Sequence, residues 1–201
     1  MSKEEIKKIV SLIEAGQKLK DDTVIFQVPV ETFEVYVMDN EHHLSVKAQK
    51  MLFDADKRDY YNVYAGSGNL SIEAFKMMLD ANDESYFARY CWNNFFSLEQ
   101  KKLIVSHKKA LRFIELMMDN SGSETTQWLE IPEADVPFVK MEGPKADRVL
   151  DRYMRDNLPL SDEAQLALFE KKDAKKWVKR YDELKGLTGK AKELAKGKGW
   201  I

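Results

Sequence analysis

The residues best suited to metal chemistry are two adjacent histidines beside two acids. His42 and His43 follow Asp39 and Glu41, and imidazole and carboxylate groups are common ligands of zinc. Adjacent histidines rarely converge on one ion without further support. We therefore interpret this stretch as a solvated turn and expect no metal site.

The other reactive side chains also favour packing or turn roles over catalysis. Cys91 stands alone between two aromatic residues, and lone cysteines are usually packing residues. The acidic pairs Asp54/Asp56 and Asp80/Asp83 recur because a turn recurs. The sequence contains no phosphate-binding glycine loop, nucleophile elbow or zinc-protease motif. We expect no catalytic or cofactor-binding residues, and hence a protein that is not an enzyme.

Length and composition indicate a folded protein of a reducing compartment. The chain has 201 residues, of which 33% are charged and 44% hydrophobic, and it has one cysteine. No signal sequence opens it, and no stretch approaches the roughly 20 apolar residues that cross a bilayer. We expect a cytoplasmic protein with no membrane partner.

A 21-residue phrase occurs twice, 26 positions apart, and it organises the chain. Residues 44–64 and 70–90 are identical at nine of 21 positions, and most of the other positions keep their chemical type. The identical pairs are Leu44/Leu70, Ser45/Ser71, Ala48/Ala74, Lys50/Lys76, Met51/Met77, Asp54/Asp80, Ala55/Ala81, Tyr60/Tyr86 and Tyr64/Tyr90. Such a repeat indicates architecture rather than activity.

Each copy of the phrase predicts a hairpin of two short helices. Ser45 and Ser71 stand where an N-cap is expected, and the apolar residues that follow would line one helix face. Polar turn formers separate this helix from a second, tyrosine-rich one. Helices of two turns are marginal alone, so the hairpins must stack. We therefore expect an all-α fold of four to six stacked short helical hairpins, in the style of an α-solenoid.

Weaker copies of the phrase follow in the second half of the chain. One begins with Ser97, another covers Leu160 to Phe169 and places Trp177 where the first copy has Tyr61, and a truncated copy restarts at Leu187. The positions shared by residues 44–53 and 160–169 read Leu-Ser-x-x-Ala-Gln-x-x-Leu-Phe.

Two regions lie outside the repeat. Near the N-terminus, Ser2 and Glu5 predict a capping box for a helix over 3–15, followed by a short strand or extended segment at 23–28 and a helix over 30–38. Residues 119–147 are rich in proline and loop formers and predict an irregular insert. We expect one helical-repeat domain over 1–201, with a subdivision into 1–118 and 148–201 around the insert as the alternative.

The repeated phrase resembles the helix-turn-helix units of HEAT and armadillo solenoids. It is more similar to bacterial proteins whose degenerate units read Leu-Ser-x-x-Ala-Gln-x-x-Leu-Phe. The resemblance covers roughly 44–116 and 153–195, and the 26-residue unit is shorter than the roughly 40 residues usual for HEAT. It implies a style of fold and assigns no activity.

Aromatic and basic residues are the candidates for contact with a partner. From Glu170 to Lys198 there are 11 Lys/Arg against 5 Asp/Glu, so this end carries +6 and the rest of the chain −8. Its lysines recur at helical spacing around Trp177, which is typical of either a solvated face or a binding surface. The residues we predict to bind a partner are Tyr64, Tyr90, Trp92, Lys175, Lys179 and Arg180.

These features favour a non-enzymatic interaction module that binds another protein through its repeat surface. The alternative is a nucleic-acid-binding repeat protein that uses the basic C-terminal unit, whose affinity for phosphates would depend strongly on salt.

Overall fold

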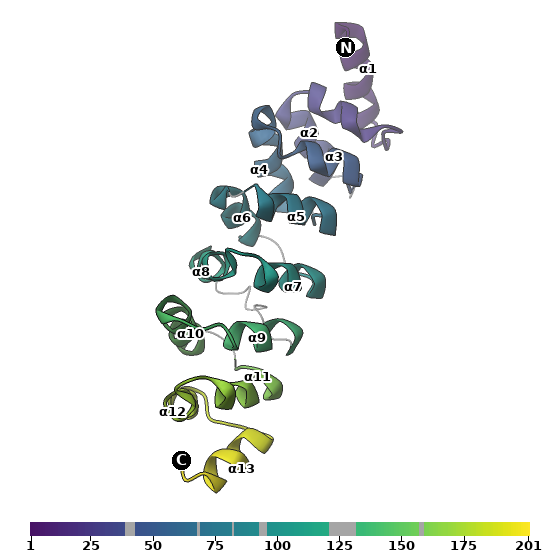
Figure 1. The fold of residues 1–201 in the computed structure, drawn as a ribbon. Coiled ribbons are helices and arrows are strands. Elements are labelled where there is room, and N and C mark those ends of the chain that lie inside the picture. The colour runs from purple at the N-terminus through teal and green to yellow at the C-terminus, as the bar shows by residue number, and fades with distance from the viewer. Residues whose placement is uncertain (39–42, 68, 82, 93–95, 121–131, 157–158) are drawn as a thin grey trace. The chain divides into compact units, whose positions relative to one another are not determined.

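The described part of the chain is helical throughout. The computed structural model describes residues 1–38, 43–67, 69–81, 83–92, 96–120, 132–156 and 159–201, and no strand occurs among them (Figure 1). This confirms the predicted all-α class. The chain divides into two compact units, Met1–Asn94 and Phe95–Ile201, which we call unit 1 and unit 2. None of the described helices has the length and apolar character needed to cross a membrane.

Unit 1 consists of a leading helix and successive helical pairs. The bounds are α1 Lys3–Glu14, η1 Asp22–Gln27, α2 Val30–Met38, α3 Val46–Met51, η2 Ala55–Lys57, α4 Arg58–Ser67, α5 Ile72–Asp80 and α6 Glu84–Cys91, where η is a 3₁₀-helix. The first helices of the pairs, η1, α3 and α5, pack side by side, as do the second helices α2, α4 and α6. The pairs therefore form two layers within the unit.

Unit 2 repeats this arrangement. Its bounds are α7 Leu98–Ser106, α8 Ala110–Asn120, α9 Pro132–Val139, α10 Pro144–Asp156, α11 Asp162–Ala167, η3 Leu168–Glu170, α12 Ala174–Leu184 and α13 Gly189–Gly197. Helices α7, α9, α11 and α13 pack in sequence to form one layer, and α8, α10 and α12 form the other (Figure 1).

The serine caps lie where the repeat predicts them. The Oγ atoms of Ser45, Ser71 and Ser161 accept the backbone N–H three residues ahead, at 3.2, 3.3 and 3.1 Å. Ser2 and Glu5 form the predicted capping box, and α1 ends just before Gly16, whose φ is 68°. Each cap satisfies an amide that the first turn of a helix leaves without a partner.

The predicted strand at 23–28 is wrong. Residues 22–27 form the 3₁₀-helix η1, because the Asp21 carboxylate accepts both the backbone N–H and the hydroxyl of Thr23, at 3.1 and 2.7 Å, and so begins a tight turn. Its apolar side chains are buried: Ile25 is 0% exposed and Phe26 3%. A lone strand would leave its backbone groups unpaired, whereas a helical turn pairs them internally.

The described part of the predicted insert is regular. Residues 132–139 form α9, and α10 begins at Pro144, so 132–147 belongs to a hairpin and is not irregular. Pro132 and Pro144 occupy the first position of their helices, where no backbone N–H is needed. Residues 121–131 lie outside the described part of the chain. The irregular composition thus marks a hairpin that begins with proline in place of serine.

A side-chain link joins successive hairpins within each unit, and the sequence did not reveal it. From the first helix of one hairpin, a side-chain amide or carboxylate oxygen accepts the backbone N–H of the next hairpin's N-cap residue. We call this contact the cap link. The links are Gln49 to Ser71 at 2.6 Å, Asp135 to Ser161 at 2.9 Å and Gln165 to Thr188 at 2.9 Å, with Asp22 to Ser45 as the first of the series.

The first described helix of unit 2 is capped differently. The Ser97 N–H donates to Oε1 of Gln100 at 2.9 Å, and the Gln100 N–H donates to Ser97 Oγ at 3.2 Å. This capping box satisfies both amides from within α7.

Asp135 makes one cap link sensitive to pH. Its side chain is fully buried and accepts both the N–H and the hydroxyl of Ser161. Burial raises the pKa of Asp135 to about 6, against the opposing effect of the Ser161 donors. The folded protein therefore holds this proton more tightly than the unfolded chain does. The resulting stabilisation is complete below the ordinary pKa of 3.8 and is lost as the pH rises through about 6.

Replacing Asp135 with asparagine should therefore gain stability relative to wild type as the pH rises. Asparagine has the same shape and carries no buried charge, so between about pH 4 and about pH 7.5 we expect a relative gain of about 1–2 kcal/mol in urea unfolding.

Asp83→Asn in unit 1 is the control with the opposite sign. Hydrogen bonds from the Ser85 side chain, and the Arg58 guanidinium, lower the pKa of Asp83. Its stabilisation is therefore present at neutral pH and lost in acid, so the asparagine variant should lose stability at neutral pH only. A pH-independent difference for Asp135→Asn would contradict the assignment.

Candidate binding site

Two of the predicted partner-binding residues lie in the core. Tyr64 is 1% exposed and Tyr90 0%. The Tyr64 hydroxyl accepts a hydrogen bond from Gln49 Nε2 at 3.1 Å, and the Tyr90 hydroxyl accepts the Leu70 N–H at 3.2 Å. A covered side chain cannot touch a partner, so these tyrosines hold the hairpins together and the predicted binding role does not apply to them.

The other candidate residues of unit 1 differ in exposure. Trp92 and His43 lie at the surface, and Cys91 is buried. Trp92 is 59% exposed at the C-cap of α6, so a role in partner contact stays a prediction for it. Cys91 is buried, and burial raises the pKa of its thiol far above the ordinary value, which disfavours the reactive thiolate. His43 is exposed, and His42 lies outside the described residues.

The three remaining candidates, Lys175, Lys179 and Arg180, come together on α12 in unit 2. Lys175 and Lys179 are exposed, and Lys172 and Lys176 are exposed beside them. We call Lys172, Lys175, Lys176 and Lys179 the lysine cluster. No carboxylate of the described residues lies within ion-pair distance of any of these four amines. Arg180 differs, because its Nε donates to Asp151 Oδ1 at 2.9 Å.

Several other cations of unit 2 are paired with carboxylates, unlike those of the lysine cluster. The pairs are Lys140–Glu170 at 2.7 Å, Lys145–Glu115 at 3.4 Å, Arg152–Asp119 at 2.8 Å and Arg155–Asp151 at 3.2 Å. Exposed pairs contribute little to stability. They neutralise their part of the surface, whereas the four lysines of the cluster keep their positive charge.

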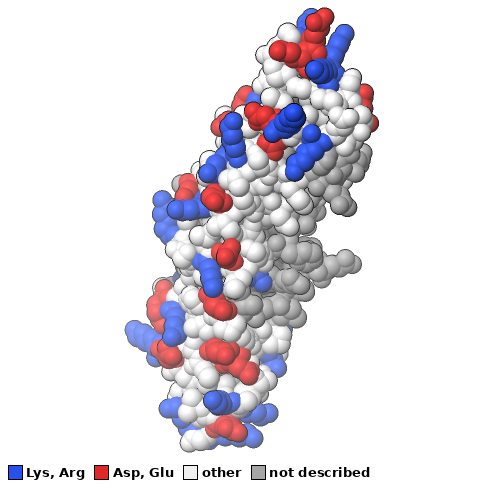
Figure 2. Space-filling model, turned by 90° about the vertical axis from the view of Figure 1, so that its right-hand side faces the viewer, with Lys and Arg blue, Asp and Glu red and all other residues white. Residues whose placement is uncertain are grey.

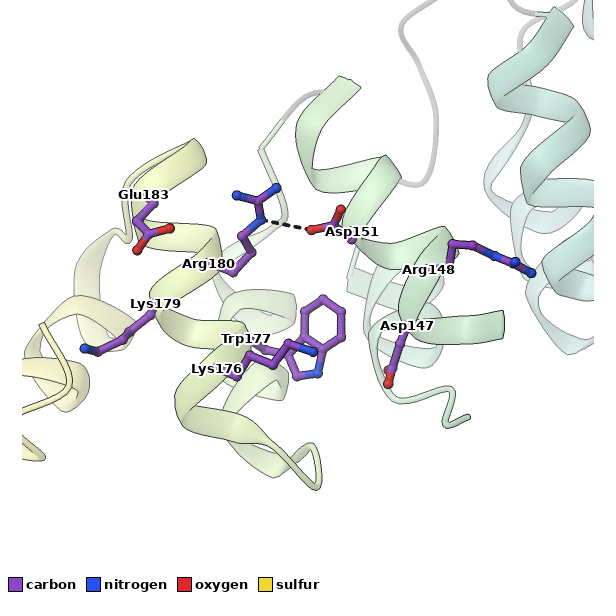
Figure 3. A pocket seen from close by; sticks show the side chains of 8 residues that line it. All are labelled: Asp147, Arg148, Asp151, Lys176, Trp177, Lys179, Arg180 and Glu183. Atoms are coloured by element: carbon purple, nitrogen blue, oxygen red, sulfur yellow. Dashed lines mark hydrogen bonds and ion pairs between the residues drawn. The ribbon is translucent and has the colours of Figure 1, made fainter. Parts of the chain in front are cut away.

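A hollow of about 490 Å³ lies between α10 and α12 beside the cluster (Figure 3). Helix α12 contributes Lys176, Trp177, Lys179, Arg180 and Glu183, and α10 contributes Asp147, Arg148 and Asp151. The two helices are the second helices of successive hairpins, and their packing fixes the spacing of the walls. Figure 3 shows the Trp177 ring directed toward α10, with Arg180 meeting Asp151 across the gap.

Trp177 forms an apolar floor with cations over it. Only 3% of the residue is exposed, and Lys176 Nζ lies 5.1 Å from the ring centroid. The hydrocarbon stem of a lysine packs on apolar surface while its amine stays in water. The hollow therefore lies over the covered Trp177 ring, and its wall carries lysine and arginine stems together with three acids.

Lys171 supports this floor from inside the protein. Its side chain is 1% exposed, and its Nζ donates to the carbonyl oxygens of Val139 and Met141, at 3.1 and 2.8 Å. It thereby closes the C-terminus of α9, where helix carbonyls lack partners. Asp147 Oδ1 lies 3.4 Å from the same amine and is itself buried without a hydrogen bond, so this ion pair is its compensation.

A second, wider hollow lies on the other side of the lysine cluster. It encloses about 760 Å³ and is lined by all four cluster lysines together with Asp173, Ala174 and Trp200. Trp200 is placed there because Gly199, with a φ of 62°, ends α13 and returns the chain toward η3. Its ring stacks on Phe169 with centroids 5.4 Å apart and 12° between the planes. Lys198 Nζ lies over this ring, 5.2 Å from its centroid.

The sequence indicated the basic segment but neither hollow. The lysine spacing around Trp177 placed the cluster on one helix, and the structure confirms that helix. The α10 wall and Trp200 come from other elements, and no short-range pattern connects them to α12. Lys171 and Lys172 look equivalent in sequence, yet one is buried and the other belongs to the cluster.

Among the described residues, no group of three or more His, Cys, Asp or Glu side chains is placed to hold a metal ion. Comparison with protein-family models, with curated proteins and with solved structures gives no significant match to the chain.

Proposed function

We propose that the protein is a non-enzymatic interaction module of the cytoplasm that binds another protein through the surface of its stacked hairpins. The lysine cluster is the docking site. The observation that carries the proposal is that these four exposed amines lie close together at α12 and have no carboxylate partner among the described residues. A partner's carboxylates would supply the missing charges, and such complementarity steers association and selects among partners.

Nucleic acid is the second candidate, because phosphates would also satisfy the uncompensated lysines. One observation favours a protein. On the face shown in Figure 2, lysine and arginine side chains are interspersed with aspartate and glutamate rather than gathered in a band.

Charge reversal in the lysine cluster tests the proposal. In affinity capture from extracts of the host, the Lys175→Glu/Lys179→Glu variant should lose a protein that the wild type retains, with a reduction of about tenfold or more. The matched control is Lys190→Glu/Lys192→Glu on α13, which reverses two exposed lysines outside both hollows and should retain it.

Two results would contradict the proposal. One is a captured protein that both variants retain equally, because the cluster would then play no part in binding. The other is capture that nuclease treatment abolishes, with direct binding of the purified protein to DNA or RNA that weakens steeply with salt, which would establish the nucleic-acid candidate.

A further inference from the structure

We propose that the element recognised at the lysine cluster is an acidic peptide segment with an apolar side chain that enters the hollow between α10 and α12. This inference rests on the proposed function and adds the chemistry of the ligand. Three features carry it: the spacing of the lysines, the shape of the hollow, and the charge that remains within it.

The lysine spacing matches carboxylates on a peptide. Lys175 and Lys179 are four residues apart on α12, which corresponds to about 6 Å along the helix, and Lys172 lies in the turn just before it. Acidic side chains four apart on a helical segment, or two apart on an extended one, repeat at about the same distance. A short acidic segment lying along α12 can therefore meet Lys175 and Lys179 in register.

The hollow suits one apolar side chain of the peptide, with the peptide's acidic side chains on either side of it. Its volume of about 490 Å³ can admit a side chain, and the hydrocarbon stems of Lys176 and Lys179 stand at its edge. Apolar anchors seated in a pocket carry most of the binding energy in many interfaces, while charges at the rim set orientation. The ligand thus needs both kinds of group.

Two of the three acids of the hollow, Asp147 and Asp151, are already compensated by the protein itself. Asp151 accepts from Arg180 and pairs with Arg155, and Asp147 pairs with buried Lys171. The lysine cluster remains available for the ligand's carboxylates. A polynucleotide fits less well, because it brings phosphates without an apolar anchor, and the Trp200 ring that could stack a base already packs on Phe169.

Fluorescence anisotropy with synthetic peptides tests this inference on the full chain. The probe is a labelled peptide of about 12 residues with glutamates four apart and one central phenylalanine, long enough to span the lysine cluster. We expect saturable binding that weakens about tenfold or more when the glutamates become glutamines, and likewise when the phenylalanine becomes serine. Lys176→Glu/Lys179→Glu should weaken it comparably, and Lys190→Glu/Lys192→Glu by less than about twofold.

Photo-crosslinking locates the apolar anchor. With a benzophenone amino acid in place of the phenylalanine, crosslinks should map to residues that line the hollow on α10 and α12. Crosslinks confined to other helices would overturn the inference, as would glutamine and serine peptides that bind as well as the parent. An oligodeoxynucleotide that displaces the peptide and binds more tightly would overturn it in favour of nucleic acid.

Failure here and failure of the proposed function give different results. If capture of a protein depends on Lys175 and Lys179 while no acidic peptide binds, the ligand chemistry is wrong and the interaction module stands. If capture is indifferent to the lysine cluster, the proposed docking site itself is wrong.

Discussion

Replacing Lys171 with methionine should lower the free energy of unfolding of unit 2 by about 3–4 kcal/mol. Methionine fills a similar volume but cannot donate to the Val139 and Met141 carbonyls, so the C-terminus of α9 loses both partners. It also removes the cation beside Asp147 Oδ1, an atom that is buried although 35% of the Asp147 side chain is exposed. The main cost is that of two carbonyl oxygens left without a donor in a largely buried place.

Urea unfolding followed by circular dichroism measures this effect, and the neighbouring residue supplies the control. Lys172 is exposed, so Lys172→Met should change stability by less than about 0.5 kcal/mol. If Lys171→Met also changed stability by less than about 1 kcal/mol, the carbonyls and Asp147 would have to be satisfied in another way.

Replacing Gln49 with leucine should destabilise unit 1 by about 3 kcal/mol. The Gln49 amide donates to the Leu44 carbonyl at 2.9 Å and to the Tyr64 hydroxyl, and its Oε1 accepts the Ser71 N–H of the next hairpin. Leucine fits the space but leaves three polar groups without this partner in a largely buried place. Each such group costs about 1 kcal/mol or more.

Amide hydrogen exchange identifies where this loss occurs. The Ser71 N–H should exchange faster in Gln49→Leu, because its acceptor is gone, and α5 should begin to fray from that end. Gln17→Leu is the control, since Gln17 is exposed and its side chain makes none of these contacts. Unchanged protection of Ser71 would show that the cap link does not hold the two hairpins together.

Local pattern was sufficient to predict the hairpins and their caps. Ser45, Ser71 and Ser161 cap helices because an N-cap depends on the residue itself and the three that follow. The segment at 23–28 was misjudged because the alternation of Val24, Phe26 and Val28 suits a strand. The contact that decides its conformation is made by the Asp21 side chain. Whether a neighbouring strand is present to pair with it depends on tertiary structure, which local sequence does not show.

The links between hairpins and the binding hollows could not be predicted in the same way. Gln49 and Gln165 stand in the repeated phrase, but nothing local says that their oxygens reach a backbone amide more than 20 residues ahead. Asp135 makes the same contact although the residues around it do not match the repeated sequence. The hollow between α10 and α12 likewise depends on helices from two hairpins. Its lysines were visible in the sequence, and its α10 wall was not.

The capping box of Ser97 and Gln100 gives unit 2 a portable beginning. A segment that starts at Ser71, Ser161 or Thr188 leaves its first amide without the acceptor that the preceding hairpin supplies. A segment that starts at Ser97 brings its own. The Ser97 amide is therefore satisfied within α7 itself, whereas the first amides of the hairpins that start at Ser161 and Thr188 depend on the hairpin before them.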